Sequence, residues 1–200
     1  MRSFNTPIKK IDNIYIKLEY KNPAGSIKDR PATYMLFDAY KKGYKEIVEA
    51  TSGNTGIALA YYGHYFGIKV TIFMPSSYSI ERQKLMRLYG ANLILVDGDM
   101  SKAINEAKNY SLYNNVYMTN QFDNRMNEFS HIQTTAPEIL SLGVKFDYFV
   151  YGVGSGGTIM GIAKILKQYG VKIIAVESKN SAPIYNKLYN KKLEIKSHSI

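Results

Sequence analysis

Short apolar runs alternate along this chain with longer stretches of mixed polarity. Four of the runs, TIF, LILV, YFVY and KIIAV, are nearly continuous, which is typical of parallel strands covered on both faces. The predicted strands span residues 13–20, 46–50, 69–74, 92–96, 116–119, 146–151 and 172–177. The predicted helices span residues 27–42, 57–66, 79–89, 101–110, 127–142 and 158–169. This alternation predicts an α/β fold with mostly parallel sheets and helices on both faces.

Three loops rich in small residues follow predicted strands and precede predicted helices, at residues 23–27, 51–56 and 152–157. In folds of this class, ligands bind beyond the carboxyl ends of the strands, close to helix N-termini. We therefore expect the three loops to lie on the binding edge of the molecule.

The loop at residues 152–157, GVGSGG, predicts a phosphate site, because glycines let backbone N–H groups approach an anion at a helix N-terminus. A plain glycine-rich turn is the simpler interpretation. The run also fits G-x-G-x-x-G, and Glu177 follows Gly157 by 20 residues, as in a dinucleotide site of a nicotinamide-dependent oxidoreductase. A nucleoside-triphosphate loop is excluded, since no Lys-Ser or Lys-Thr pair follows.

The loop TSGNTG at residues 51–56 offers hydroxyl, amide and backbone donors that suit a carboxylate. A polar loop that only caps a helix is the alternative. Lys28 lies close to a helix start that Ser26 and Asp29 indicate by a capping-box-like spacing. There the helix dipole and burial both disfavour a charged amine, so Lys28 is a candidate nucleophile or base. Taken alone, Lys28 is better interpreted as a surface lysine in the first turn of a helix.

The formal charge of +10 comes from scattered lysines, which indicates a solvated basic surface that also attracts phosphate-bearing ligands. Charge alone does not support nucleic-acid binding. No run of 18 apolar residues and no signal-peptide pattern appears, so we expect neither a membrane span nor export. Cysteine is absent, which fits a cytoplasmic protein. His64, His131 and His198 show no metal-ligand spacing, and we expect them to be structural and no metal to bind.

Together, the loops present an amine, a carboxylate site and a phosphate site. Pyridoxal 5'-phosphate acting on an amino acid requires these three parts.

Longer motifs support this cofactor: NPAGSIKDRPA around Lys28, TSGNTGIALA from Thr51 and GVGSGGTIMG from Gly152. With Gln121-Phe122 and TTAPEI at 134–139, they resemble, in order, the fold type II (tryptophan-synthase-β-like) pyridoxal-phosphate enzymes, and within them the cysteine synthases. The resemblance implies a two-lobed architecture and a homodimer. Residues 23–125 would form the smaller, mobile lobe, and residues 1–22 with 126–200 the larger lobe, the C-terminal part of the family fold being absent.

The resemblance also implies roles for single residues. Lys28 would be catalytic and carry the cofactor covalently, and Asn54 would bind the ring hydroxyl oxygen. The cofactor phosphate would be held by Gly154, Ser155, Gly156, Gly157 and Thr158. The substrate α-carboxylate would be held by Thr51, Ser52, Gly53, Thr55 and Gln121.

The activity implied by the resemblance is β-replacement that forms L-cysteine from O-acetylserine, or O-phosphoserine, and sulfide. Cystathionine β-synthase-like activity, serine/threonine dehydratase activity and a truncated, catalytically silent protein are the alternatives. A nicotinamide-dependent oxidoreductase, supported by the glycine run and Glu177 alone, is the more distant one.

Overall fold

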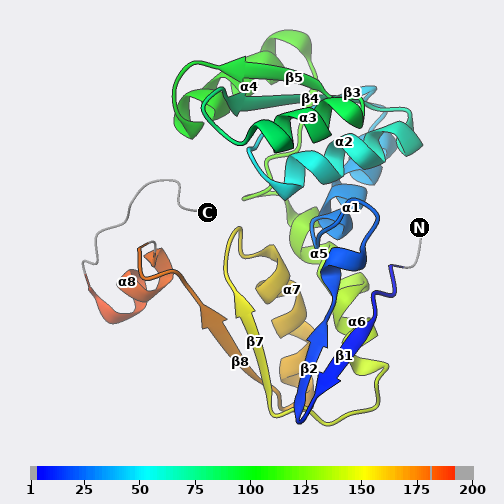
Figure 1. Ribbon diagram of the computed structural model, residues 1–200, viewed down its shortest axis with the longest axis vertical. Helices are drawn as coiled ribbons and strands as arrows, with labels where there is room; N and C mark the ends of the chain where they lie inside the picture. The colour runs from blue at the N-terminus through cyan, green and yellow to red at the C-terminus, as the bar shows by residue number, and fades with distance from the viewer. Residues whose placement is uncertain (1–3, 181, 192–200) are drawn as a thin grey trace.

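A four-stranded parallel sheet forms the upper part of the molecule in Figure 1. The computed structural model describes residues 4–180 and 182–191. The strand order is β5-β4-β3-β6, and every neighbouring pair is parallel. The strands are β3 (Glu46–Ala50), β4 (Lys69–Pro75), β5 (Asn92–Val96) and β6 (Tyr117–Met118). The predicted parallel sheet is confirmed.

Helices cover both faces of this sheet. Successive strand residues point to opposite sides, so each strand contributes side chains to the cores on both faces. Ile47 and Ile72 enter a core with α1 (Asp29–Lys41), α2 (Asn54–Phe66) and α3 (Ile80–Leu88). Val48 and Phe73 enter a second core with α4 (Met100–Asn114). The prediction of helices on both faces is therefore confirmed for the four-stranded sheet.

The remaining parallel strands form a separate pair, β7 (Tyr148–Gly152) with β8 (Lys172–Val176). Their core includes Ile139, Ile162 and Leu166. The helices on this side are α5 (Arg125–Gln133), α6 (Thr135–Leu140), α7 (Gly157–Leu166), the 3-10 turn η2 (Lys167–Tyr169) and α8 (Pro183–Tyr189). In Figure 1, α1 and α5 pack together between the large sheet and this pair. The division into two lobes remains a prediction.

The N-terminal region forms an antiparallel hairpin of β1 (Ile8–Ile11) and β2 (Ile14–Lys17). The prediction of one strand over residues 13–20 was wrong in extent, and it missed β1. Lys9 and Lys10 interrupt the apolar pattern there, and both are exposed because the hairpin faces water. A short 3-10 turn, η1 (Glu19–Lys21), replaces the end of the predicted strand.

The helix predicted over residues 127–142 is divided into α5 and α6. The break lies at Thr134, whose φ of −126° is not helical. Pro137 falls in the first turn of α6, where its missing N–H leaves no helical hydrogen bond unmade. Proline in the interior of one long helix would clash with the preceding turn, so the chain starts a new helix instead.

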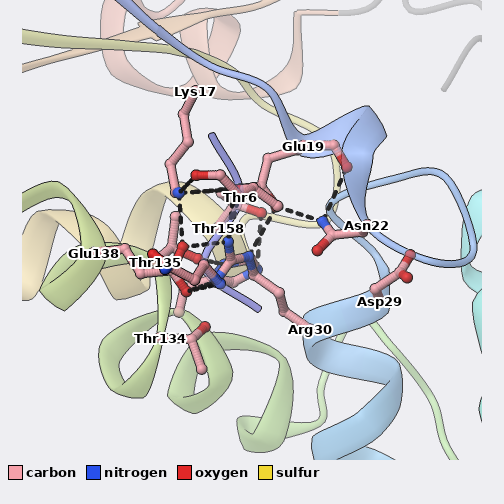
Figure 2. A network of polar contacts seen from close by, with 12 residues as sticks. Thr6, Lys17, Glu19, Asn22, Asp29, Arg30, Thr134, Thr135, Glu138 and Thr158 are labelled. Atoms are coloured by element: carbon pink, nitrogen blue, oxygen red, sulfur yellow. Dashed lines mark hydrogen bonds and ion pairs between the residues drawn. The ribbon is translucent and has the colours of Figure 1, made fainter. Parts of the chain in front are cut away.

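A buried network of charges joins the hairpin side, α1 and α6 (Figure 2). The fully buried Arg30 donates to Glu19 Oε2 from Nε at 2.8 Å, and to both carboxylate oxygens of Glu138 at 2.7 Å each. Lys17 Nζ lies 2.6 Å from Glu138 and 2.7 Å from the hydroxyl of Thr6. Because Arg30 follows Lys28 by two residues, this network fixes the start of α1.

We expect the charge network to make the protein acid-sensitive. Burial raises the pKa of Glu138, but the hydrogen bonds from Arg30 and Lys17 outweigh it and lower the pKa from 4.5 to about 2. A lowered pKa stabilises the folded state above the unfolded value of 4.5. This stability is lost as the pH falls from 4.5 towards 2. Urea unfolding across that range should show it, and Glu138→Gln should flatten the dependence. An equally steep loss in that variant would contradict the assignment to Glu138.

Candidate active site

The turn before α1 brings Lys28 to the start of the helix. Ser26 Oγ accepts a hydrogen bond from the Lys28 N–H at 3.1 Å. The buried carboxylate of Asp29 accepts from the N–H groups of Ala24 at 2.7 Å and Ser26 at 3.3 Å. Asp29 bonds back to the Ser26 N–H as the capping-box-like spacing predicts, but Ser26 is not the N-cap, and α1 begins at Asp29 and not at residue 27. Lys28 is the N-cap residue of α1.

The amine of Lys28 lies where two other loops arrive. Its Nζ donates to Ser155 Oγ at 3.3 Å and to Gln121 Oε1 at 3.4 Å. Burial lowers the pKa of the Lys28 amine, and the carboxylate of Glu49 opposes this in part. The interpretation of Lys28 as an ordinary surface lysine is therefore wrong.

The loop at residues 51–55 joins the carboxyl end of β3 to the N-terminus of α2. Thr51 and Thr55 are buried. Thr55 Oγ1 donates to Gln121 Oε1 at 2.6 Å, so the loop and Gln121 belong to one cluster. Ser52, Gly53 and Asn54 are more accessible. The first N–H groups of a helix lack partners within it, which suits a carboxylate at this position.

The glycine loop at residues 152–157 lies opposite, between β7 and α7. Gly156 adopts a left-handed conformation, with φ of 83°, and α7 begins at the next residue. Ser155 Oγ accepts from Asn127 Nδ2 at 2.9 Å. Thr158 Oγ1 lies 3.1 Å from His131 Nε2. The loop is thereby fixed from α5 as well as from its own helix.

Gly157 permits a close approach between α7 and α5. A Cβ at this position would collide with the side-chain amide of Asn127. We therefore expect Gly157→Ala to destabilise the fold by about 1–3 kcal/mol and to weaken binding of a phosphate ligand, as measured by urea unfolding and by titration with pyridoxal phosphate.

The control for this substitution is Gly152→Ala in the same loop. A Cβ there would meet nothing within 4 Å. Both quantities should remain close to those of the unsubstituted chain. Equal effects of the two substitutions would contradict the role of the contact between Gly157 and Asn127.

The structure adds polar residues that the sequence did not single out for the site. Glu49 accepts a hydrogen bond from the backbone N–H of Gln121, and Asn127 Nδ2 donates to Ser155 Oγ. Arg82 Nη1 donates to the backbone oxygen of Ser52 at 3.2 Å. The only sequence signal for Glu49 is a second carboxylate inside the apolar strand EIVEA. Asn127 and Arg82 carry no local signal, because their partners are distant in sequence.

The surroundings of His131, His64 and Glu177 indicate which of them have a structural role. His131 is buried between Thr135 and Thr158, and burial together with nearby positive charge lowers its pKa to about 3, consistent with a structural role. His64 is exposed on α2, and His198 lies outside the described residues. Glu177 accepts from the N–H groups of Ile184 and Tyr185 at the start of α8. Its carboxylate thus binds the N-terminus of α8, which is a role other than binding a ribose.

Within residues 4–180 and 182–191, no group of three or more histidine or acidic side chains is arranged to hold a metal ion. No helix in this part of the chain is both long and apolar enough to cross a membrane.

The donor set fits pyridoxal phosphate. One half-buried amine with a lowered pKa suits an aldehyde, and it lies beside Ser155 of a glycine-rich helix N-terminus that suits a phosphate. The N-cap Gly156 and the first helical residue Gly157 carry no side chain at the N-terminus of α7, and Gly157 packs closely on Asn127. Gln121 Oε1 accepts hydrogen bonds from this amine and from Thr55 of the loop at residues 51–55.

Comparison with known proteins gives a consistent result. A cysteine synthase of a Flavobacterium species is 46% identical over 190 residues, which are 86% of this chain and 62% of that protein. The structure of an O-ureido-L-serine synthase has a TM-score of 0.88 at 37% identity, covering 98% of this chain and 66% of that one. An O-acetylserine dependent cystathionine β-synthase from Helicobacter pylori has a TM-score of 0.85 at 34% identity, covering 100% of this chain and 71% of that one.

These matches establish the fold class as that of the fold type II pyridoxal-phosphate enzymes. The chain spans less than two thirds of the length of the Flavobacterium relative. Residues 3–200 match the family described as pyridoxal-phosphate dependent enzyme. The chain belongs to the pyridoxal-phosphate dependent enzyme family.

Proposed function

We propose that this chain catalyses a β-replacement that forms L-cysteine from O-acetylserine, or O-phosphoserine, and sulfide. The observation that carries the proposal is the position of the Lys28 amine, 3.3 Å from Ser155 of the phosphate loop and 3.4 Å from Gln121 of the carboxylate cluster. The similarity to a protein named cysteine synthase supports the choice of reaction.

Each loop has a binding role in this proposal. Gly154, Ser155, Gly156, Gly157 and Thr158 hold the cofactor phosphate. Thr51, Ser52, Gly53, Thr55 and Gln121 hold the substrate α-carboxylate, and Asn54 binds the ring hydroxyl oxygen. The bound cofactor supplies an electron sink for the negative charge that develops at the substrate Cα.

Lys28 has the proton-transfer role. Its Nζ takes the proton from the substrate Cα, the acetate or phosphate group leaves from Cβ, and Nζ returns a proton to Cα after sulfide has bonded to Cβ. A lowered pKa increases the neutral fraction of the amine near neutral pH, which a base requires. Gln121 and Ser155 orient the amine by accepting its hydrogen bonds. The loop at 51–55 closes over the substrate and excludes water during the reaction.

The proposal includes a homodimer in the cytoplasm, as expected for a cysteine synthase. Exposed apolar side chains on β7 and β8, Val150, Ile174 and Val176, are consistent with a further protein surface covering this sheet face. Light scattering after size-exclusion chromatography measures the mass, and a monomer at micromolar concentration would contradict the dimer.

The test of the reaction is sulfide-dependent formation of cysteine by the purified chain loaded with pyridoxal phosphate. O-acetylserine and O-phosphoserine should be supplied separately, and product should require both the serine derivative and sulfide. Absence of product with either donor, in a chain that has bound the cofactor, would contradict the proposal.

Cystathionine β-synthase-like activity is the second candidate, because one structural relative carries that name. Replacing sulfide by homocysteine separates the two reactions. Faster turnover with homocysteine than with sulfide would favour this candidate. Ammonia and keto acid formed from serine or threonine alone would instead indicate a dehydratase.

A further inference from the structure

Glu49 is a buried carboxylate at the carboxyl end of β3, with only 2% of its surface exposed. Its Oε2 accepts hydrogen bonds from Thr119 Oγ1 at 2.6 Å and from the backbone N–H of Gln121 at 3.1 Å. Its Oε1 accepts from the backbone N–H of Ala50 at 3.0 Å. Three donors in fixed positions satisfy this carboxylate, so the side chain has one orientation.

Gln121 connects the fixed carboxylate of Glu49 to the site. Its Oε1 accepts from Lys28 Nζ at 3.4 Å and from Thr55 Oγ1 at 2.6 Å. Its backbone oxygen accepts from Asn127 Nδ2 at 2.8 Å. Because Glu49 holds the main chain of Gln121, it determines where the amide oxygen meets both the amine and the carboxylate loop.

The charge of Glu49 faces the same amine. Burial raises the pKa of Glu49 to about 7, against the hydrogen bonds from Thr119, Gln121 and Ala50 and the charge of Lys28. The other titratable side chain that senses Lys28 is His131 on α5, which is neutral above its pKa of about 3. Above its pKa of about 7, Glu49 is thus the anion that favours the charged form of the amine.

We propose that Glu49 is a positioning residue for the Lys28 amine, fixing Gln121 against it and supplying the negative charge that faces it. This role deepens the proposed function and rests on it. Glu49 touches neither the predicted phosphate loop nor Lys28 by a hydrogen bond of its own. It acts through Gln121 and through the electrostatic field of its carboxylate.

The test is the titration of Lys28 in the cofactor-free chain. A trace of acetic anhydride labels neutral amines, and mass spectrometry of the Lys28 peptide across pH gives the midpoint. In Glu49→Gln the opposing anion is gone, so the midpoint should fall by roughly one pH unit. Labelling at a fixed pH below the midpoint should then rise about tenfold. Glu46→Gln, on the same strand but paired with Lys69, should leave the Lys28 midpoint unchanged.

An unchanged midpoint in Glu49→Gln, or an equal shift in Glu46→Gln, would overturn the inference. Thr119→Val provides a second variant if Glu49→Gln does not fold. It removes the 2.6 Å hydrogen bond to Glu49, so Glu49 should hold its proton to higher pH and the Lys28 midpoint should fall by a smaller amount. No shift in that folded variant would contradict the proposal.

A separate readout distinguishes this inference from the proposed reaction. Labelling uses no cofactor or substrate, so it is independent of cysteine formation. A midpoint shift without cysteine formation would contradict the proposed function and support the role of Glu49. Cysteine formation with no shift of the Lys28 midpoint in any variant would support the proposed function and contradict the role of Glu49.

Discussion

Lys28→Ala is expected to abolish the visible absorption band that pyridoxal phosphate acquires on the protein and to reduce cysteine formation by about 10²- to 10⁴-fold. The reason is that this amine lies within hydrogen-bond reach of both Ser155 of the phosphate loop and Gln121 of the carboxylate cluster. Alanine removes both the covalent attachment and the base. Absorbance titration and the sulfide-dependent assay measure the two losses.

The matched control is Lys41→Ala, which removes an exposed lysine from the last turn of the same helix. It should bind the cofactor and react like the unsubstituted chain. If Lys28→Ala kept the band and the rate, another amine would carry the cofactor, and the proposed site would be in the wrong place.

Arg30→Ala is expected to lower the free energy of unfolding by about 3–5 kcal/mol, because it removes the guanidinium that binds two largely buried carboxylates and leaves Lys17 to compensate both of them. Glu19 and Glu138 have side chains only 14% exposed, and both bind Arg30 at 2.7–2.8 Å. A loss of this size is a large part of the stability of an ordinary domain. Urea unfolding monitored by circular dichroism measures it.

Breaking the exposed pair of Lys42 with Asp38 provides the comparison. Their distance is also 2.7 Å, but the lysine side chain is 54% exposed. Lys42→Ala should therefore cost less than about 1 kcal/mol. Similar losses in Arg30→Ala and Lys42→Ala would show that burial does not determine the contribution of the network.

That each of the three loops leads from a strand into a helix could be predicted from the order of the elements. That the loops meet could not be predicted from strand order, because they follow strands of three separate sheets. Residues 23–28 follow the antiparallel hairpin, residues 51–56 follow β3 of the four-stranded sheet, and residues 152–157 follow β7. The structure brings Lys28 to Ser155, 127 positions later in the chain, as the chemistry of the three loops indicated.

The supporting groups could not be predicted, because their partners are far apart in sequence and their own segments carry no pattern. Glu49 contacts Thr119 and Gln121 across 70 and 72 positions, and Arg30 contacts Glu138 across 108. From local sequence, Glu49 is a charge in an apolar strand and Arg30 is a helix residue. Only packing shows that one fixes the site and the other fixes the helix that carries Lys28.

Mapping the site of cofactor attachment tests the central claim most directly. The chain loaded with pyridoxal phosphate is reduced with borohydride, which makes the bond between an amine and the cofactor permanent, and the digested peptides are analysed by mass spectrometry. We predict that the added mass lies on Lys28, and that Lys28→Ala carries none. A chain that binds the cofactor and forms cysteine with the added mass on a different lysine would contradict the account.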